Sequence, residues 1–97
     1  LFERLDQKAS LKAKLLSARN DYLNAVQQLE IYTENAKSTR KLLDAELNMF
    51  NTGESTLFMI NAREIAAFQA ELKALNYMAK TEQLWLKWQF LQANLVR

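Results

Sequence analysis

The stretch MFNTGESTLFMINARE, residues 49–64, contains the only glycine of this 97-residue chain, which has no proline. Gly53 suits the left-handed conformation that often follows the last residue of a helix. Ser55 or Thr56 can accept the first free amides of a following helix as its N-cap, and Glu54 would place a carboxylate near the positive end of that helix. The stretch therefore predicts a tight turn that joins two antiparallel helices.

The sequence before this turn has the spacing of one long helix. Apolar residues alternate three and four positions apart, which is the heptad pattern of a packed helical seam. This row is Leu11, Leu15, Ala18, Tyr22, Ala25, Leu29, Tyr32, Ala36, the polar Thr39, and Leu43. A second row is expected to widen the buried face. It comprises Phe2, Ala9, Leu16 and Leu23, with Val26 beside it. We expect this helix over residues 2–50.

The sequence after the turn has apolar residues on three sides of a helix. The first row is Ile65, Phe68, Leu72, Leu75, Ala79, Glu82, Leu86, Gln89, Ala93 and Val96. The second is Leu57, Ile60, Ala67, Ala74, Met78, Trp85, Trp88 and Leu95, and the third is Ala70, Tyr77, Leu84 and Leu91. A helix with several apolar faces must be covered by more than one neighbour. The predicted fold is all-α: a long antiparallel, coiled-coil-type hairpin over 1–97, with a turn at 51–55 and a second helix at 56–96.

Composition argues against several classes of function. The chain has 13 basic and 11 acidic residues without a basic block, so we expect no nucleic-acid binding. It has neither cysteine nor histidine, the residues most used for nucleophilic, general-base and metal chemistry, so we expect no enzyme, cofactor or metal. The first residue is Leu1 and the last residues keep the helical pattern, so we expect a segment of a longer protein.

Four large apolar residues, LFMI at 57–60, follow the turn directly. We expect Leu57 and Ile60 to pack back onto Met49 and Phe50 as a hydrophobic staple. The side chains between them would then point elsewhere, and an exposed apolar tip typically marks a contact surface.

Polar and aromatic residues beyond the tip allow further expectations. Arg63 and Glu64 either bridge to a neighbouring hairpin or form a solvated face, and the solvated face is favoured because exposed ion pairs contribute about 0 to 1 kcal/mol. The aromatic residues of the second helix are expected to pack between helices rather than at a membrane interface. An antiparallel register about Gly53 places Trp85 and Trp88 near residues 18–22.

Residues 50–92 resemble the repeat of the TolC-like outer-membrane efflux proteins. In that repeat an aromatic residue, a glycine and small hydroxyl residues precede an aliphatic run and a short Asp/Asn-Ala-Gln/Arg signature, followed by a long helix. The matching pieces here are Phe50, Gly53, Ser55 with Thr56, Leu57 to Ile60, and Asn61-Ala62-Arg63. The family pattern often has aspartate where Asn61 stands, and carboxylates there can form an anionic ring at the entrance. Whether this chain forms such a ring is left open, because Asn61 is uncharged.

The resemblance implies a trimer whose hairpins form an α-barrel in the periplasm, beneath an outer-membrane β-barrel, that exports drugs or secreted proteins. The turn would be the periplasmic tip that meets an adaptor and an inner-membrane transporter. The implied adaptor-contact residues are Asn51, Thr52, Gly53, Glu54, Ser55, Thr56 and Leu57. The implied constriction residues are Phe58, Met59, Asn61, Arg63 and Glu64. The alternative is a generic scaffold hairpin that recruits partner helices, but three apolar rows on the second helix favour the barrel.

Overall fold

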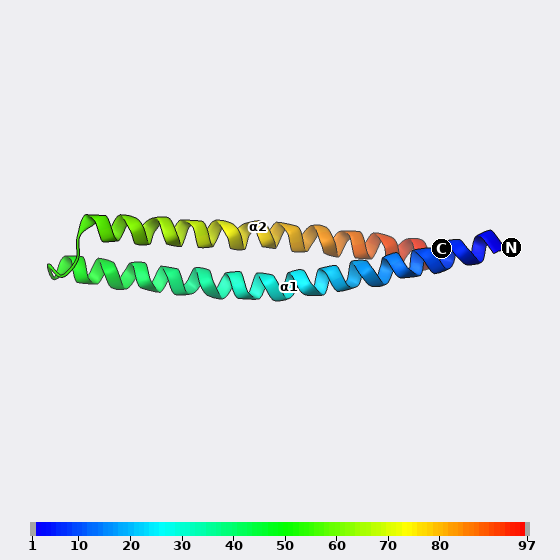
Figure 1. The fold of residues 1–97 in the computed structure, drawn as a ribbon, viewed down its shortest axis with the longest axis horizontal. Coiled ribbons are helices and arrows are strands. Elements are labelled where there is room, and N and C mark those ends of the chain that lie inside the picture. Colours follow the sequence, from blue (N-terminus) through cyan, green and yellow to red (C-terminus); the bar gives the residue numbers. More distant parts are fainter. Residues whose placement is uncertain (1, 97) are drawn as a thin grey trace.

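The computed structural model describes residues 2–96 and the side chains of residues 5–95. It consists of two helices, α1 (Phe2–Asn51) and α2 (Leu57–Val96), which run antiparallel (Figure 1). The molecule measures 78 × 15 × 14 Å, and the first turns of α1 extend past the end of α2. The predicted all-α helical hairpin is confirmed.

The turn between the helices ends α1 in a Schellman motif. The amide of Gly53 donates to the carbonyl of Phe50 at 3.0 Å, and the amide of Glu54 donates to the carbonyl of Met49 at 2.7 Å. Gly53 has a φ of +81°, as the left-handed position requires. The helix α2 then starts after Thr56, whose hydroxyl accepts the amide of Met59 at 3.2 Å. Of the two predicted N-cap candidates, Thr56 is therefore the cap.

The face of α1 that contacts α2 is the predicted heptad row. Every member of that row from Leu11 to Leu43 is buried or half-buried, while most of the residues between them are exposed. The second predicted row is wrong as a buried face: Ala9, Leu16 and Leu23 are exposed, and the side chain of Phe2 lies outside the described residues. One partner helix covers one seam, and this second row lies beyond its reach. Only Val26, beside the seam, is half-buried.

The face of α2 that contacts α1 combines members of the second and third predicted rows with two polar residues. This inner row alternates three and four residues apart. It consists of Ile60, Arg63, Ala67, Ala70, Ala74, Tyr77, Thr81, Leu84, Trp88, Leu91 and Leu95. The first predicted row is exposed except at Gln89, which is half-buried, and the side chain of its last member, Val96, lies outside the described residues. Small residues such as Ala67 and Ala70 line the inner row, which lets the two helices approach closely.

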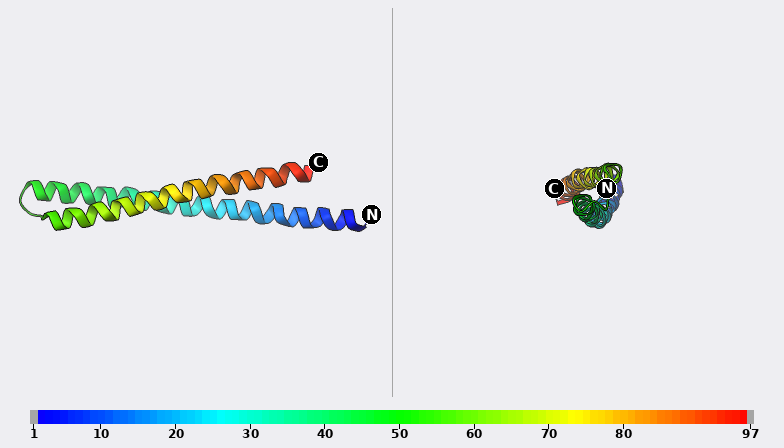
Figure 2. Two further views of the ribbon diagram at one scale, coloured as in Figure 1. Left: turned by 90° about the horizontal axis from the view of Figure 1, so that it is seen from above. Right: turned by 90° about the vertical axis from the view of Figure 1, so that its left-hand side faces the viewer.

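Aromatic rings fix the register of the two helices. Tyr22 packs on Trp88 with ring centroids 5.6 Å apart, and Tyr32 packs on Tyr77 at 4.6 Å. The predicted placement near residues 18–22 is confirmed for Trp88, whereas Trp85 lies in a groove beside Tyr22 and is 44% exposed instead of packing between the helices. Phe90 was expected to pack between helices but is 67% exposed, because it lies off the inner row. In Figure 2 the helices cross as they run along the molecule, as a shared heptad seam requires.

No stretch within the described part of either helix is both long and apolar enough to cross a membrane.

Candidate interaction surface

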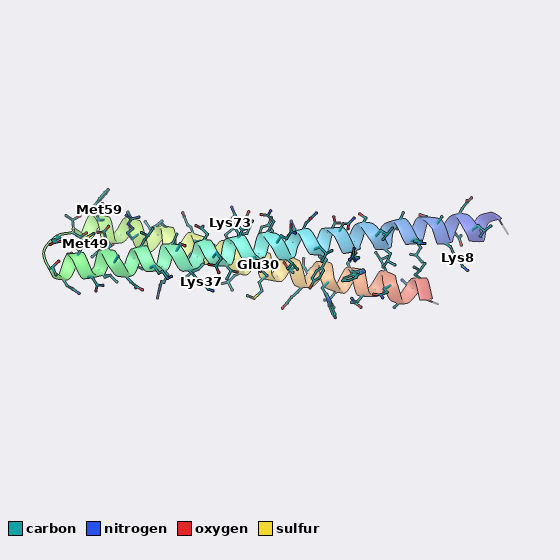
Figure 3. The ribbon with its side chains drawn as sticks, turned by 90° about the horizontal axis from the view of Figure 1, so that it is seen from below. Lys8, Glu30, Lys37, Met49, Met59 and Lys73 are labelled. Carbon is teal, nitrogen blue, oxygen red and sulfur yellow. The ribbon has the colours of Figure 1, made fainter. Side chains whose placement is uncertain are left out.

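The tip of the hairpin presents an exposed polar turn next to exposed apolar side chains. Among the predicted adaptor-contact residues, all are exposed except Ser55, which is half-buried. Of the predicted constriction residues, Phe58 is 79% exposed, and Met59, Asn61 and Glu64 are also exposed. Figure 3 labels Met49 and Met59 at this end, one from each helix. The two predicted sets therefore form one accessible surface, except where Ser55 and Arg63 turn inward.

Of the two residues predicted to form the hydrophobic staple, only Ile60 is buried, and it packs in a cluster that contains neither Met49 nor Phe50. Ile60 is 5% exposed and belongs to a core cluster with Leu43 and Ala67. Leu57 is 64% exposed, so the prediction that it packs back onto α1 is wrong. Leu57 is the first residue of α2 and stands off the inner row, where α1 offers no surface to cover it. Together with Phe58 it forms the most exposed apolar pair of the tip.

Arg63 contributes to the seam instead of the surface. Its Nε donates to Oε1 of Glu46 at 3.3 Å, and Glu46 is only 4% exposed. The bridge to another hairpin stays a prediction, and the favoured solvated face is only partly met, because the Arg63 side chain is 39% exposed but pairs with Glu46. The physical reason is that a buried carboxylate of α1 lies opposite Arg63 and needs a partner.

Glu46 is the buried polar residue that the sequence reasoning missed. A signal was present: one further heptad step from Leu43 along the predicted seam reaches Glu46. An acidic residue at a seam position requires a cation on the facing helix, and the antiparallel register brings Arg63 there. The pair joins α1 to α2 three residues beyond Leu43, a member of the Ile60 cluster.

The outer face of α2 carries a long apolar row that α1 leaves uncovered. Its large members are between 47% and 66% exposed: Ile65, Phe68, Leu72, Leu75 and Leu86. Grooves connect this row with the seam along one side of the hairpin. One groove lies between Arg40, Leu43 and Phe68, a second between Thr33, Ala74 and Met78, and a third between Tyr22, Trp85 and Leu86. The outer row is therefore continuous with the α1–α2 interface.

We call this side of the hairpin the groove flank, defined by Thr33, Arg40, Glu71, Met78 and Trp85. It contains the ion pair between Arg40 and Glu71, whose Nη1 and Oε1 atoms are 3.7 Å apart.

The opposite side differs in chemistry. Lys73, Lys80 and Lys87 follow one another at intervals of seven residues, and we call this side the lysine flank. The Nζ atoms of Lys73 and Lys80 lie 4.5 Å and 5.1 Å from the centroids of the Tyr32 and Tyr77 rings. Figure 3 labels Lys73 and Lys37 at opposite edges of the hairpin.

The described residues contain no group of three or more acidic side chains that could hold a metal ion. No family model, curated protein or solved structure matches this chain.

Proposed function

We propose that the chain is the periplasmic hairpin of a trimeric, TolC-like outer-membrane duct that exports drugs or secreted proteins. The turn at Gly53 would be its periplasmic tip, in contact with an adaptor and close to an inner-membrane transporter. The observation that carries this proposal is the uncovered outer row of α2. A free-standing hairpin needs one apolar seam, and this helix has two.

The tip supports the same proposal. Its turn is short and ordered by a Schellman motif, yet Leu57 and Phe58 beside it expose large apolar side chains. Exposed apolar residues at the end of a thin hairpin are a liability unless a partner covers them. In a duct, the partners would be an adaptor and neighbouring hairpins.

Opening of such a duct would move the tips of neighbouring hairpins past one another. The Glu46–Arg63 pair holds Arg63 to its own hairpin, so Asn51, Glu54, Asn61 and Glu64 are the members of the expected polar set that stay exposed and able to contact neighbours. The heptad seam would stay packed during this motion.

Photocrosslinking in living cells tests the proposal. A photoreactive residue at Thr52 probes the exposed tip, and one at Leu86 probes the outer row of α2. A probe at Trp88 would be less suitable, because Trp88 packs on Tyr22 within the hairpin. A probe at Asn20, exposed on α1 far from the tip, is the control.

We expect Thr52 adducts with a periplasmic adaptor, Leu86 adducts with other hairpins of the same protein, and no adaptor adduct from Asn20. If the Thr52 probe captures only cytosolic or unrelated helical proteins, the duct is excluded and the scaffold hairpin takes its place.

A further inference from the structure

The inner and outer rows of α2 share one heptad period, so the angle between them is constant along the helix. The inner row repeats from Ile60 through Ala67 to Ala74, and the outer row from Ile65 through Leu72 to Ala79, each in steps of seven residues. At 3.5 residues per turn, each residue advances by about 103° around the helix. Measured around the helix axis, the centres of the two rows are then about 155° apart in the direction that crosses the groove flank. They are about 205° apart in the direction that crosses the lysine flank.

The outer row is suited to contact with a further long helix. Its members are spaced three and four residues apart, the pattern that fits knobs of one helix into holes of another. From Ile65 to Ala79 the row is apolar without interruption over about 21 Å, at 1.5 Å per residue, and beyond it Glu82 and Gln89 alternate with Leu86 and Ala93. It is also continuous, through the grooves, with the existing interface between the two helices. A helix of a second hairpin, running alongside α2, meets all three conditions.

Helices packed side by side form a wall. Where the two neighbours of a helix lie less than 180° apart around its axis, the wall bends at that helix. The concave side of the wall is the side with the smaller angle. Here the wall turns by about 25° at each α2, toward the groove flank. We propose that the groove flank, with Thr33, Arg40, Glu71 and Met78, is the concave side of the assembled wall and lines the passage. The lysine flank is the convex outer side.

The inference rests on the proposed function, and it adds the surface that an exported molecule would meet. The groove flank offers the Arg40–Glu71 ion pair beside the apolar Met78 and Trp85. Charged side chains lie on both flanks: Lys37 and Lys41 line the groove beside Arg40 and Glu71, and Lys73, Lys80 and Lys87 lie on the lysine flank. The passage is therefore expected to suit amphipathic solutes, which combine apolar and charged groups.

Two single-cysteine variants of the full-length protein test the assignment in planar lipid bilayers. Met78→Cys is on the groove flank, and Lys80→Cys, two residues later, is its matched control on the lysine flank. The 97 residues contain no native cysteine, so each thiol is unique within this segment. Each variant is treated with thiol reagents of positive and of negative charge, and labelling is quantified by mass spectrometry.

We expect the ion selectivity of the Met78→Cys channel to shift in opposite directions with the two reagents, and that of the Lys80→Cys channel to stay unchanged. Unchanged selectivity after complete labelling of Met78→Cys, or a shift in Lys80→Cys alone, overturns the lining assignment. The proposed duct would not be contradicted by that result, provided that the protein conducts ions. If the unmodified full-length protein forms no channel, both the duct and the lining assignment fall.

Discussion

At the scale of single residues, two positions hold the tip in shape by different means. Gly53 supplies a left-handed backbone, and Glu46 supplies a buried carboxylate that accepts a hydrogen bond from Arg63. The left-handed backbone at Gly53 is a local requirement of the turn, whereas the Glu46–Arg63 pair depends on the facing helix.

Gly53→Ala should destabilise the hairpin through its backbone alone. A β-carbon at this position would meet no atom within 4 Å, so no clash adds to the conformational strain. We expect a loss of about 1 to 2 kcal/mol in the free energy of unfolding, measured by urea denaturation. Gly53→Asn is the control and should cost less, because asparagine adopts the left-handed region more readily. Equal stability of all three proteins would contradict this account of the turn.

Arg63→Met should leave the Glu46 carboxylate buried without a partner. We expect a loss of about 1.5 to 3 kcal/mol, the range for a buried hydrogen bond to a charged group. The double variant Glu46→Leu with Arg63→Met removes both charges and should recover most of that loss. A double-mutant cycle by thermal unfolding measures the coupling. Additive effects of the two single changes would show that the pair does not interact.

At the scale of the elements, the two apolar rows of α2 have different tasks. The inner row stabilises the hairpin against α1, whereas the outer row contributes little until a neighbour covers it. Leucines on the two kinds of surface make this difference measurable.

Leu43→Ala and Leu75→Ala form a matched pair. Leu43 is 7% exposed in the core cluster, so its truncation should cost about 2 to 3 kcal/mol. Leu75 is 59% exposed on the outer row, and its truncation should change the stability of the dilute chain by no more than about 0.5 kcal/mol. Unfolding followed by circular dichroism gives both values. A large loss for Leu75→Ala would mean that the outer row is already covered in solution.

At the scale of the whole molecule, the hairpin is extended. Its Cα radius of gyration is 21.7 Å, compared with about 13 Å for a compact domain of about 100 residues. No large side chain in the described part of the chain is fully buried. We therefore expect association to add to the stability of this molecule.

The midpoint of thermal unfolding of the 97-residue chain should therefore rise with protein concentration, because association stabilises the folded state. Changing Ile65, Leu72 and Leu75 to glutamine should weaken this dependence. A control variant changes three exposed polar residues of α1, Asn20, Gln27 and Asn48, to alanine and should keep it. Sedimentation equilibrium measures the mass of each protein. A midpoint independent of concentration in the unaltered chain would indicate that the outer row does not drive association.

The sequence by itself determined the hairpin, the seam of α1 and the position of the turn. One glycine in a chain without proline, placed between two heptad patterns, leaves few other folds. The antiparallel register also followed from the turn, which is why the contact of Trp88 near residues 18–22 could be predicted.

Only the tertiary structure decided which rows of α2 face inward, because all three rows are largely apolar and periodicity alone does not rank them. The choice depends on how closely two helices can approach, and the small residues Ala67, Ala70 and Ala74 permit the closer contact. The pairing of Glu46 with Arg63 and the exposure of Leu57 depend on the same choice. Both features depend on which residue of the facing helix lies opposite. The sequence of one helix alone does not contain that information.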